Sequence, residues 1–261
     1  MWFLVLRLTR STLPLCSALA AWIVSRACGS DSITSAIAAT AIGLSTLAAS
    51  FYHYGGQDKM YARKAERLEF SDPQLLMLTG LTIFSLSIAV SVAWLPKACT
   101  YTCLFNTVAI TAYSHKLSSH WATKNLTIGI VCMTPVYIGW QAGTTTHPLV
   151  PWALGTALLS QVAREMVKDV QDIVANEGIR VTLPMVLGTQ RVLQIAGLLL
   201  LGATATLVGV LQFTEGLLQQ LMVLASAVIF VFVARELALY RLGKSQTAIT
   251  AGLLFVLIAL L

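Results

Sequence analysis

The amino-acid sequence predicts an all-α integral membrane protein, a bundle of nine transmembrane helices with a polar cap on the cytoplasmic side. Of the 261 residues, 57% are hydrophobic and only 11% are charged, whereas soluble domains carry about 25% charged residues. The mean hydropathy is +0.77. Nine apolar segments have roughly the 17–25 residues that a helix needs to cross a bilayer. These three observations exclude a soluble globular protein.

The nine apolar segments cover approximately residues 11–28, 33–55, 74–95, 98–114, 124–142, 148–166, 188–211, 216–236 and 245–261. The stretch from Met1 to Arg10 is an apolar run broken by arginines. It has no small-residue cleavage site followed by a soluble chain, so we expect it to lead into the first helix rather than to act as a signal peptide. One compact bundle is the simplest organisation, so residues 1–261 are expected to form a single transmembrane domain.

Basic residues support the nine-helix topology. If the N-terminus and every second loop lie on one side, that side holds fifteen of the 17 lysines and arginines, and only Arg26 and Lys97 lie on the other. The positive-inside rule then places the N-terminus in the cytoplasm and the C-terminus on the opposite side. The net charge of +6 is explained by this topology, so no nucleic-acid partner is expected.

The acidic residues follow the basic ones, which topology alone does not require. Nine of the eleven lie on the same predicted side; Asp31 and Glu215 do not. Three connections on that side, residues 57–72, 115–124 and 164–191, are rich in polar and charged groups. We therefore expect a ligand site at the cytoplasmic face. No motif of a serine hydrolase, zinc protease or phosphate-loop enzyme is present, and the segment interiors lack the acids typical of a transporter.

The densest block of charge is residues 164–188. Asp169, Asp172 and Asn176 stand at i, i+3 and i+7, so a helix would place them on one face. Oxygen ligands arranged in this way suit Mg²⁺, which commonly bridges carboxylates and phosphates. The cations of this block that would neutralise phosphate oxygens are Arg164, Lys168 and Arg180. The alternative is a cytoplasmic helix end with ordinary surface charges.

This block resembles the second aspartate-rich motif of the UbiA superfamily of intramembrane prenyltransferases. The matching residues are Lys168-Asp169-Val170-Gln171-Asp172, Gly178, Arg180, Thr182-Leu183-Pro184 and Gly188. Weaker matches in the same order along the chain are Arg10-Ser11, Tyr113-Ser114, Lys116-Leu117 and Asn125-Leu126. The resemblance implies nine transmembrane helices, two aspartate motifs on cytoplasmic loops, Mg²⁺ and an isoprenyl diphosphate substrate whose tail lies among the helices.

The first aspartate motif of that family, Asn-Asp-x-x-Asp-x-x-x-Asp, is degenerate here. In residues 51–67 only Asp58 remains as a nearby carboxylate, while Gln57 and His53 can hydrogen-bond phosphate or a metal-bound water. Asn176 likewise replaces the last aspartate of the second motif. Aromatic residues stand where the acids are missing, and their faces would stabilise an allylic cation: Phe51, Tyr52, Tyr54 and Tyr61. The alternative is an aromatic belt at the membrane interface.

The resemblance implies a role for each candidate residue. The catalytic residues would be Asp169, Asp172 and Asp58, and Asn176 would join them in holding Mg²⁺. The residues that would bind diphosphate are Arg10, Gln57, Tyr113, Ser114, Lys116, Arg164, Lys168 and Arg180. Lys124, at the other end of the 115–124 connection from Lys116, would also face the diphosphate. For both lysines, a plain positive-inside role is the alternative.

The sequence leaves three functions open. The first is prenyl transfer to an aromatic or lipid acceptor. The second is cyclisation, in which the substrate's own double bonds capture the cation, as in the terpene cyclases of the same superfamily. The degenerate first motif and the aromatic run favour this second function, whereas the greater number of transferases favours the first. The third is a non-catalytic relative that binds a lipid. The oligomeric state, the prenyl chain length and the acceptor are not predicted.

Overall fold

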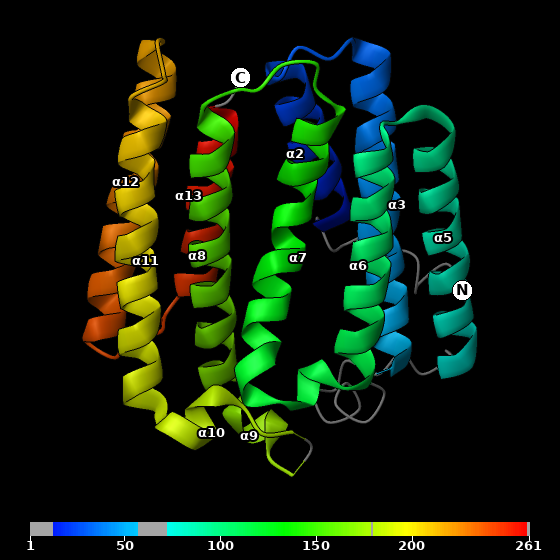
Figure 1. Cartoon of the computed structure of the whole chain (residues 1–261). Helices are drawn as coiled ribbons and strands as arrows, with labels where there is room; N and C mark the ends of the chain where they lie inside the picture. The colour runs from blue at the N-terminus through cyan, green and yellow to red at the C-terminus, as the bar shows by residue number, and fades with distance from the viewer. Residues whose placement is uncertain (1–12, 57–71, 179, 260–261) are drawn as a thin grey trace. The chain divides into compact units, whose positions relative to one another are not determined.

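A computed structural model of the chain describes residues 13–56, 72–178 and 180–259, and in these residues every regular element is helical (Figure 1). The prediction of an all-α protein is confirmed. Four helices are long and apolar enough to cross a membrane, and two further apolar helices are shorter. The chain is an integral membrane protein; nine membrane crossings and a cytoplasmic cap stay a prediction.

A helix lies in each of the nine apolar segments. These helices are α2 Leu13–Ala27, α3 Ser32–Gly56, α5 Pro73–Trp94, α6 Lys97–His115, α7 Trp121–Ala142, α8 Leu149–Gln171, α11 Thr189–Leu211, α12 Leu217–Ala238 and α13 Ser245–Ile258. Short helices lie in two of the polar connections: η1 Leu117–Ser119, α9 Ile173–Asn176 and α10 Leu183–Leu187. The four candidate membrane spans correspond to α3, α5, α11 and α12.

Acidic residues cap the N-terminal ends of α3 and α5, a role that the hydropathy pattern did not predict for them. Asp31 accepts hydrogen bonds from the Thr34 hydroxyl and from the backbone N–H groups of Ile33 and Thr34. The hydrogen bond from the Thr34 side chain lowers the pKa of Asp31 below its usual value. Asp72 caps α5 in the same way, accepting from the backbone N–H of Gln74 at 2.8 Å. Such caps satisfy backbone donors that a helix start leaves unpaired.

The chain divides into two compact units. Unit 1 comprises Met1–Ser118 and Thr134–Thr146, and unit 2 comprises Ser119–Met133 and His147–Leu261. The division falls inside α7, next to Pro135. Because proline has no backbone N–H, it removes one hydrogen bond from the helix at that place.

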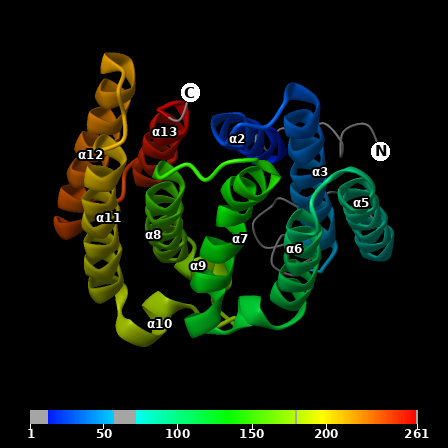
Figure 2. The ribbon, with the colours of Figure 1, turned by 45° about the horizontal axis from the view of Figure 1, so that its top comes forward.

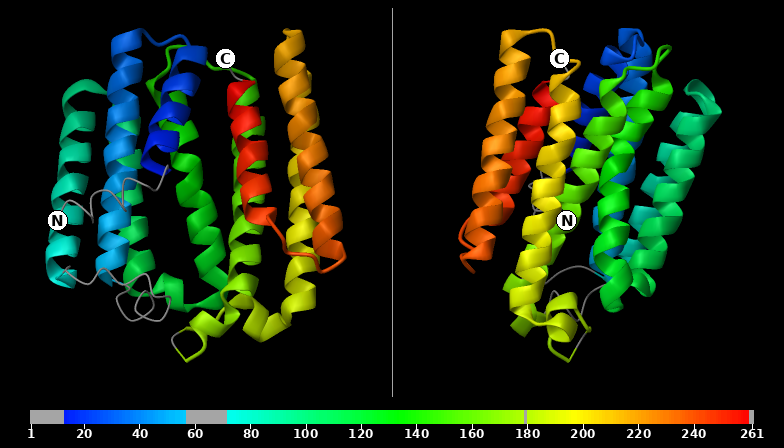
Figure 3. Two further views of the ribbon diagram at one scale, coloured as in Figure 1. Left: turned by 180° about the vertical axis from the view of Figure 1, so that it is seen from behind. Right: turned by 60° about the vertical axis from the view of Figure 1, so that its left-hand side comes forward.

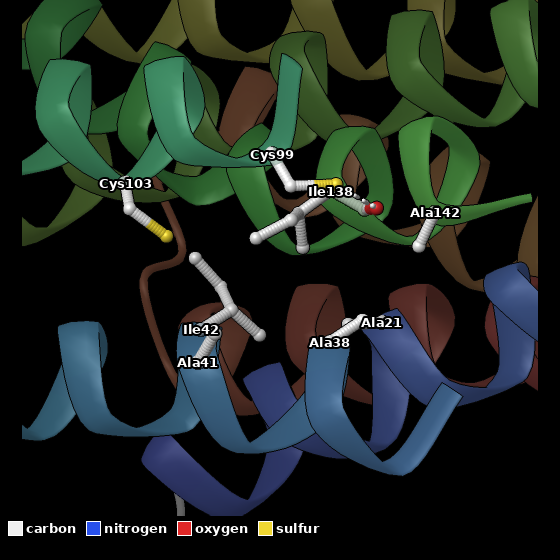
Figure 4. Close-up of a cluster of buried hydrophobic side chains, with 8 residues drawn as sticks. All are labelled: Ala21, Ala38, Ala41, Ile42, Cys99, Cys103, Ile138 and Ala142. Atoms are coloured by element: carbon white, nitrogen blue, oxygen red, sulfur yellow. Dashed lines mark hydrogen bonds between the residues drawn. The ribbon is translucent and has the colours of Figure 1, made fainter. Parts of the chain in front are cut away.

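The core of unit 1 is built from small side chains. It contains Ala21, Ala38, Ala41, Ile42, Cys99, Cys103, Ile138 and Ala142 (Figure 4). The thiol of Cys99 donates to the backbone oxygen of Ile138 at 3.7 Å. A Cβ on Gly139 would lie 2.6 Å from the backbone oxygen of Ala21. Small residues therefore let α2 and α7 approach closely, as is common between membrane helices.

A second close approach, between α3 and α5, positions the residues at the end of α3. A Cβ on Gly80 would lie 2.8 Å from the backbone nitrogen of Tyr52 and 3.0 Å from the backbone oxygen of Ala48. Next to this contact, Phe51 packs against Leu76 in a second buried cluster of unit 1. The glycine on α5 thus determines how closely the helix can lie against the aromatic run of α3.

Changing Gly80 to alanine is expected to destabilise the protein by about 1–3 kcal/mol, because the added methyl group must push α5 away from α3. Gly202→Ala, in another candidate membrane span, is the matched control: its Cβ would meet Leu159 Cδ1 at 3.4 Å, an ordinary contact. Thermal unfolding in detergent should show a lower midpoint for Gly80→Ala and an unchanged or raised one for Gly202→Ala. Equal midpoints would contradict the close packing of α3 and α5.

Unit 2 is organised around α8 and α11. Helix α11 packs against α8 and α12, and α13 packs against α8 and α12 (Figure 3). The hydroxyl groups of Thr156 on α8 and Thr206 on α11 are 2.7 Å apart, and the Ser226 hydroxyl on α12 donates to the backbone oxygen of Gly252 on α13 at 2.9 Å. The short helix α10 lies at the N-terminal end of α11 (Figure 2).

Candidate functional site

The second aspartate-rich segment lies where α8 ends. Asp172 is the C-cap residue of α8, and α9 begins directly after it. The backbone N–H of Asp172 donates to the Lys168 oxygen at 2.9 Å, and that of Asn176 donates to the Asp172 oxygen at 3.0 Å. Helical spacing therefore continues past the break. Asp169 and Asn176, seven residues apart, are both fully buried, whereas Asp172 is half-buried.

Asp169 is paired with a buried lysine. Lys124, in the first turn of α7, is 2% exposed, and its ammonium group donates to Oδ1 of Asp169, which is 1% exposed. A Cβ on Gly129 would lie 2.5 Å from Cγ2 of Val162, so the first half of α7 lies close against α8 in this unit. Two charges withdrawn from solvent are tolerated only when each neutralises the other.

A further carboxylate lies one helical turn before Asp169. Glu165 is buried, and its carboxylate is 3.2 Å from Nη1 of Arg164 and 3.8 Å from the ammonium group of Lys168. Lys124 interacts electrostatically with Glu165 and with Arg180 as well as with Asp169. Four cations thus accompany the buried acids Glu165 and Asp169 and the half-buried Asp172. We call Lys124, Arg164, Glu165, Lys168, Asp169, Asn176 and Arg180 the Lys124 cluster.

Arg180 is held inward by Asn176. Its Nε donates to Oδ1 of Asn176 at 2.8 Å, and the arginine is buried. The turn that brings the two residues together passes through Gly178, whose φ of +72° favours glycine. The side-chain oxygen of Asn176 is therefore already engaged by a guanidinium group of the same chain.

Several buried polar atoms of unit 2 have no hydrogen-bond partner among the residues that the structure describes. They are Nδ2 and Oδ1 of Asn125, Nε of Arg164, Oδ2 of Asp169, Nδ2 of Asn176 and Oγ1 of Thr182. Buried polar groups are almost always paired, so a group of unpaired ones indicates a place for a ligand, an ion or water. All of them belong to the start of α7, the end of α8 or the segment that follows α8 up to the start of α10.

The second segment can hold one hard cation. In the described parts of the chain no three His, Cys, Asp or Glu residues are grouped to bind a metal. Two carboxylates of the segment are nevertheless candidate ligands: that of Asp172, and that of Asp169, whose Oδ2 has no partner among the described residues. Mg²⁺ takes one or two carboxylates and fills its other positions with water and substrate phosphate, so this donor set fits it.

A second polar cluster, in unit 1, joins the end of α3 to the end of α6. The Tyr52 hydroxyl and Nε2 of His115 are 2.7 Å apart, and Nδ1 of His53 lies 3.2 Å from the Ser114 hydroxyl. The His53 ring also lies against the Tyr113 ring, with centroids 5.2 Å apart. Tyr52, Tyr113 and Ser114 are buried. We call these five residues the His53 cluster.

The residues predicted from the sequence thus fall into five groups. Asp169, Asn176, Arg164, Lys168 and Arg180 lie in the Lys124 cluster, with Asp172 beside it at the end of α8. Tyr52, Tyr113 and Ser114 lie in the His53 cluster. Phe51 and Tyr54 pack with Leu76 in the core, and Lys116 is exposed after α6. Arg10, Gln57, Asp58 and Tyr61 lie outside the described residues.

Sequence reasoning assigned no role to Glu165 or His115, and it did not predict the pairing of Lys124 with Asp169. A signal for Glu165 was present: it stands four residues before Asp169 in the predicted helix, so both carboxylates share a face. His115 follows Ser114 directly but offers no comparable signal.

The family is shown by comparison with known proteins. The model of the UbiA prenyltransferase family matches residues 57–259, which include the whole of the Lys124 cluster. The chain belongs to the UbiA prenyltransferase family. The resemblance that the second aspartate-rich segment suggested is therefore confirmed. A search of the curated proteins gives no match to this UbiA-family chain.

Solved structures share the fold of this UbiA-family chain. A UbiA homologue from Aeropyrum pernix K1 has a TM-score of 0.77 and 17% identity, over 96% of this chain and 95% of that one. A structure of digeranylgeranylglyceryl phosphate synthase has a TM-score of 0.76 and 17% identity, over 97% and 94%. A UbiA homologue from Archaeoglobus fulgidus, bound to GPP and Mg²⁺, has a TM-score of 0.63 and 14% identity, over 93% and 96%.

Proposed function

We propose that this protein is an intramembrane enzyme that ionises an isoprenyl diphosphate with Mg²⁺ and transfers the prenyl group to an aromatic or lipid acceptor. Family membership supports the reaction class. The Archaeoglobus fulgidus homologue was solved with GPP and Mg²⁺ and with DMAPP and Mg²⁺, which supports the substrate class and the metal. The observation that carries the proposal is the Lys124 cluster, which combines four cations with a buried carboxylate oxygen, Oδ2 of Asp169, that has no hydrogen-bond partner among the described residues.

The cations of the cluster are suited to a diphosphate. Arg164 has a buried Nε without a partner among the described residues, so it has a donor to offer a phosphate oxygen. Lys168, with its side chain 43% exposed, stands at the edge of the cluster, while Arg180 is fixed inside by Asn176. Arginine matches phosphate oxygens with paired donors, whereas lysine acts as a point charge. We therefore assign diphosphate binding to Arg164, Lys168 and Arg180.

Mg²⁺, when bound, would supply positive charge to the diphosphate as it leaves. Oδ2 of Asp169 and the carboxylate of Asp172 would hold the ion, and Asp58 is proposed as a further ligand from the sequence. Lys124 occupies Oδ1 of Asp169 and leaves Oδ2 as the oxygen still available. Lys124 thereby holds the Asp169 carboxylate in one orientation. Asn176 would act mainly through Arg180, because its side-chain oxygen accepts the Arg180 N–H.

The protein's own contribution to catalysis is electrostatic. As the carbon–oxygen bond of the allylic diphosphate breaks, negative charge grows on the leaving oxygens. Donors fixed around that position stabilise the transition state more than the ground state. Arg180 and Arg164 are buried or half-buried and already oriented by neighbouring side chains, so little reorganisation is needed when the bond breaks.

Terpene cyclisation is the second candidate, and the His53 cluster favours it. Tyr52 and Tyr113 bring two buried phenol rings next to His53 and His115. Aromatic faces stabilise a carbocation, and an imidazole is able to take the proton that a cyclised cation loses at the end of the reaction.

The proposal extends to topology. The N-terminus and the active site are assigned to the cytoplasmic side and the C-terminus to the other side, and residues 1–261 to a single domain. Fifteen of the 17 basic residues support this orientation. Membrane lipids surround the protein, and no nucleic-acid partner is proposed.

The test is incubation of the purified protein with Mg²⁺ and geranyl, farnesyl or geranylgeranyl diphosphate, with and without aromatic and lipid acceptors. We expect a prenylated acceptor only when acceptor, Mg²⁺ and substrate are all present, as followed by mass spectrometry. A cyclic hydrocarbon or terpene alcohol formed without acceptor would instead establish the cyclase. If no diphosphate is consumed or bound under any of these conditions, the enzyme assignment is wrong and a non-catalytic relative remains.

A further inference from the structure

An apolar groove lies between α11 and α12, and none of the residues that line it belongs to the Lys124 cluster. Its volume is about 540 Å³, and it is lined by Leu193, Gln194, Gly197, Leu198, Leu201, Val231, Ala234, Arg235 and Ala238. That volume is within the range of roughly 300–1,000 Å³ that small-molecule sites occupy. Both helices are candidate membrane spans. The groove is therefore large enough for part of a lipid and lies between two helices that are each long and apolar enough to cross a membrane.

The groove exists because small residues face each other across it. On α11 the lining positions 194, 197, 198 and 201 share one helical face, and on α12 the positions 231, 234, 235 and 238 do the same. A Cβ on Gly197 would lie 3.4 Å from the backbone oxygen of Ala234, which places these two residues opposite each other. The walls remain open to the surroundings, since Leu198 is 67% and Val231 47% exposed.

One end of the groove is polar. Nε2 of Gln194 donates to the Tyr240 hydroxyl at 3.4 Å, and the amide of Gln190 donates to the same oxygen. Tyr240 follows α12 with a φ of +58°, a left-handed conformation that is unfavourable for any residue with a Cβ. A strained residue of this kind persists only where its surroundings hold it, and such residues gather at binding sites. The Tyr240 hydroxyl lies at the Gln194 end of the groove.

Arg235 brings an incompletely neutralised charge into the groove. It lies in the last turn of the span Leu217–Ala238, with its side chain 68% exposed. Its acidic neighbour Glu236 lies 3.8 Å away and is shared with Arg241, also at 3.8 Å. One carboxylate thus serves two arginines. Because Glu236 cannot fully neutralise both arginines, the exposed guanidinium group of Arg235 keeps positive charge with which to attract an anion at this end of the span.

We propose that this groove binds an anionic phospholipid. The phosphate would meet Arg235, with Gln194 and the Tyr240 hydroxyl beside it, and an acyl chain would lie along Leu193, Leu198 and Leu201. Basic pockets between membrane helices are known to bind anionic headgroups in this way. The nine lining residues include one arginine and no carboxylate, which suits the single charge of a phosphodiester rather than a metal-bound diphosphate. The proposal does not depend on the proposed enzymatic function.

The test measures lipid binding by native mass spectrometry of the whole protein in detergent, with phosphatidylglycerol and phosphatidylcholine as probes. The wild-type protein is expected to bind phosphatidylglycerol about tenfold more tightly than phosphatidylcholine. This is the difference in affinity that one charge-assisted hydrogen bond provides. Arg235→Gln should remove most of this preference. Arg241→Gln is the matched control, because it removes the same charge and the same Glu236 contact without lining the groove; it should keep the preference.

Filling the groove gives a second, independent test. Gly197→Ala adds a methyl group at ordinary contact distance and serves as the folding control, whereas Gly197→Leu extends into the groove and should weaken binding of phosphatidylglycerol by a similar factor. Equal loss in Arg235→Gln and Arg241→Gln would show a general surface attraction and overturn the proposal. Displacement of bound phosphatidylglycerol by farnesyl diphosphate would overturn it too, because the groove would then belong to the substrate.

Discussion

Changing Asp169 to alanine is expected to destabilise the protein by about 3–5 kcal/mol, because it leaves the ammonium group of Lys124 buried without its partner. Lys124→Met should have an effect of similar size, since it leaves the Asp169 carboxylate uncompensated at 1% exposure. Both variants should also lose prenyl diphosphate turnover. The measurements are the midpoint of thermal unfolding in detergent and Mg²⁺-dependent consumption of the diphosphate.

The double variant Lys124→Met with Asp169→Leu separates stability from function. Replacing both members of a buried ion pair by apolar side chains of similar size is often neutral or stabilising. We expect the double variant to unfold close to the wild-type midpoint. The effects of the two single changes on the free energy of unfolding should therefore be far from additive. Turnover should stay absent. Two stable single variants would show that Lys124 and Asp169 are not paired. Turnover restored in the double variant would show that Asp169 has only a structural role.

The helices were predictable because length and hydropathy determine them locally. Helix α5 covers Pro73–Trp94 where the apolar pattern predicts 74–95, and α11 covers Thr189–Leu211 where it predicts 188–211. The main difference is α8, which continues to Gln171 beyond the predicted end at 166. Its last turn is charged, and hydropathy ends a segment at the first charges. Asp169 in this turn is buried and paired with Lys124, so the turn packs within unit 2 although it is charged.

The interior of the site was less predictable, because it depends on contacts between helices. In the sequence, Lys124 is one of many basic residues on the predicted cytoplasmic side, and topology explains it fully. Only the packing of α7 on α8 at Gly129 brings its ammonium group to Asp169. The aromatic run shows the same limit: Phe51 faces Leu76 in the core, whereas the adjacent Tyr52 reaches His115. Neighbouring residues on a helix point in different directions, and the sequence did not reveal which direction leads to the site.

Changing Asp172 to asparagine is expected to lower Mg²⁺-dependent turnover at least about a hundredfold, since each 1.36 kcal/mol of lost transition-state stabilisation is a factor of ten. The fold should be little affected. Asp172 is half-buried at the C-cap of α8, where the helix dipole disfavours a negative charge, so the neutral amide removes an unfavourable interaction with that helix. A variant that unfolds at the wild-type midpoint but requires far more Mg²⁺ would assign the carboxylate to the metal.

The control for this change is Glu177→Gln, which removes the same charge from an exposed carboxylate one turn after α9 begins. It should change turnover by less than about twofold, because an exposed charge near the site is screened by water. Equal losses of turnover in the two variants would mean that turnover depends only on the total charge of this segment and not on the position of the carboxylate. Full activity in Asp172→Asn would remove this residue from the catalytic set. Asp169, held by Lys124, would then be the only metal-binding carboxylate proposed in the second motif, and Asp58 would have to supply the other.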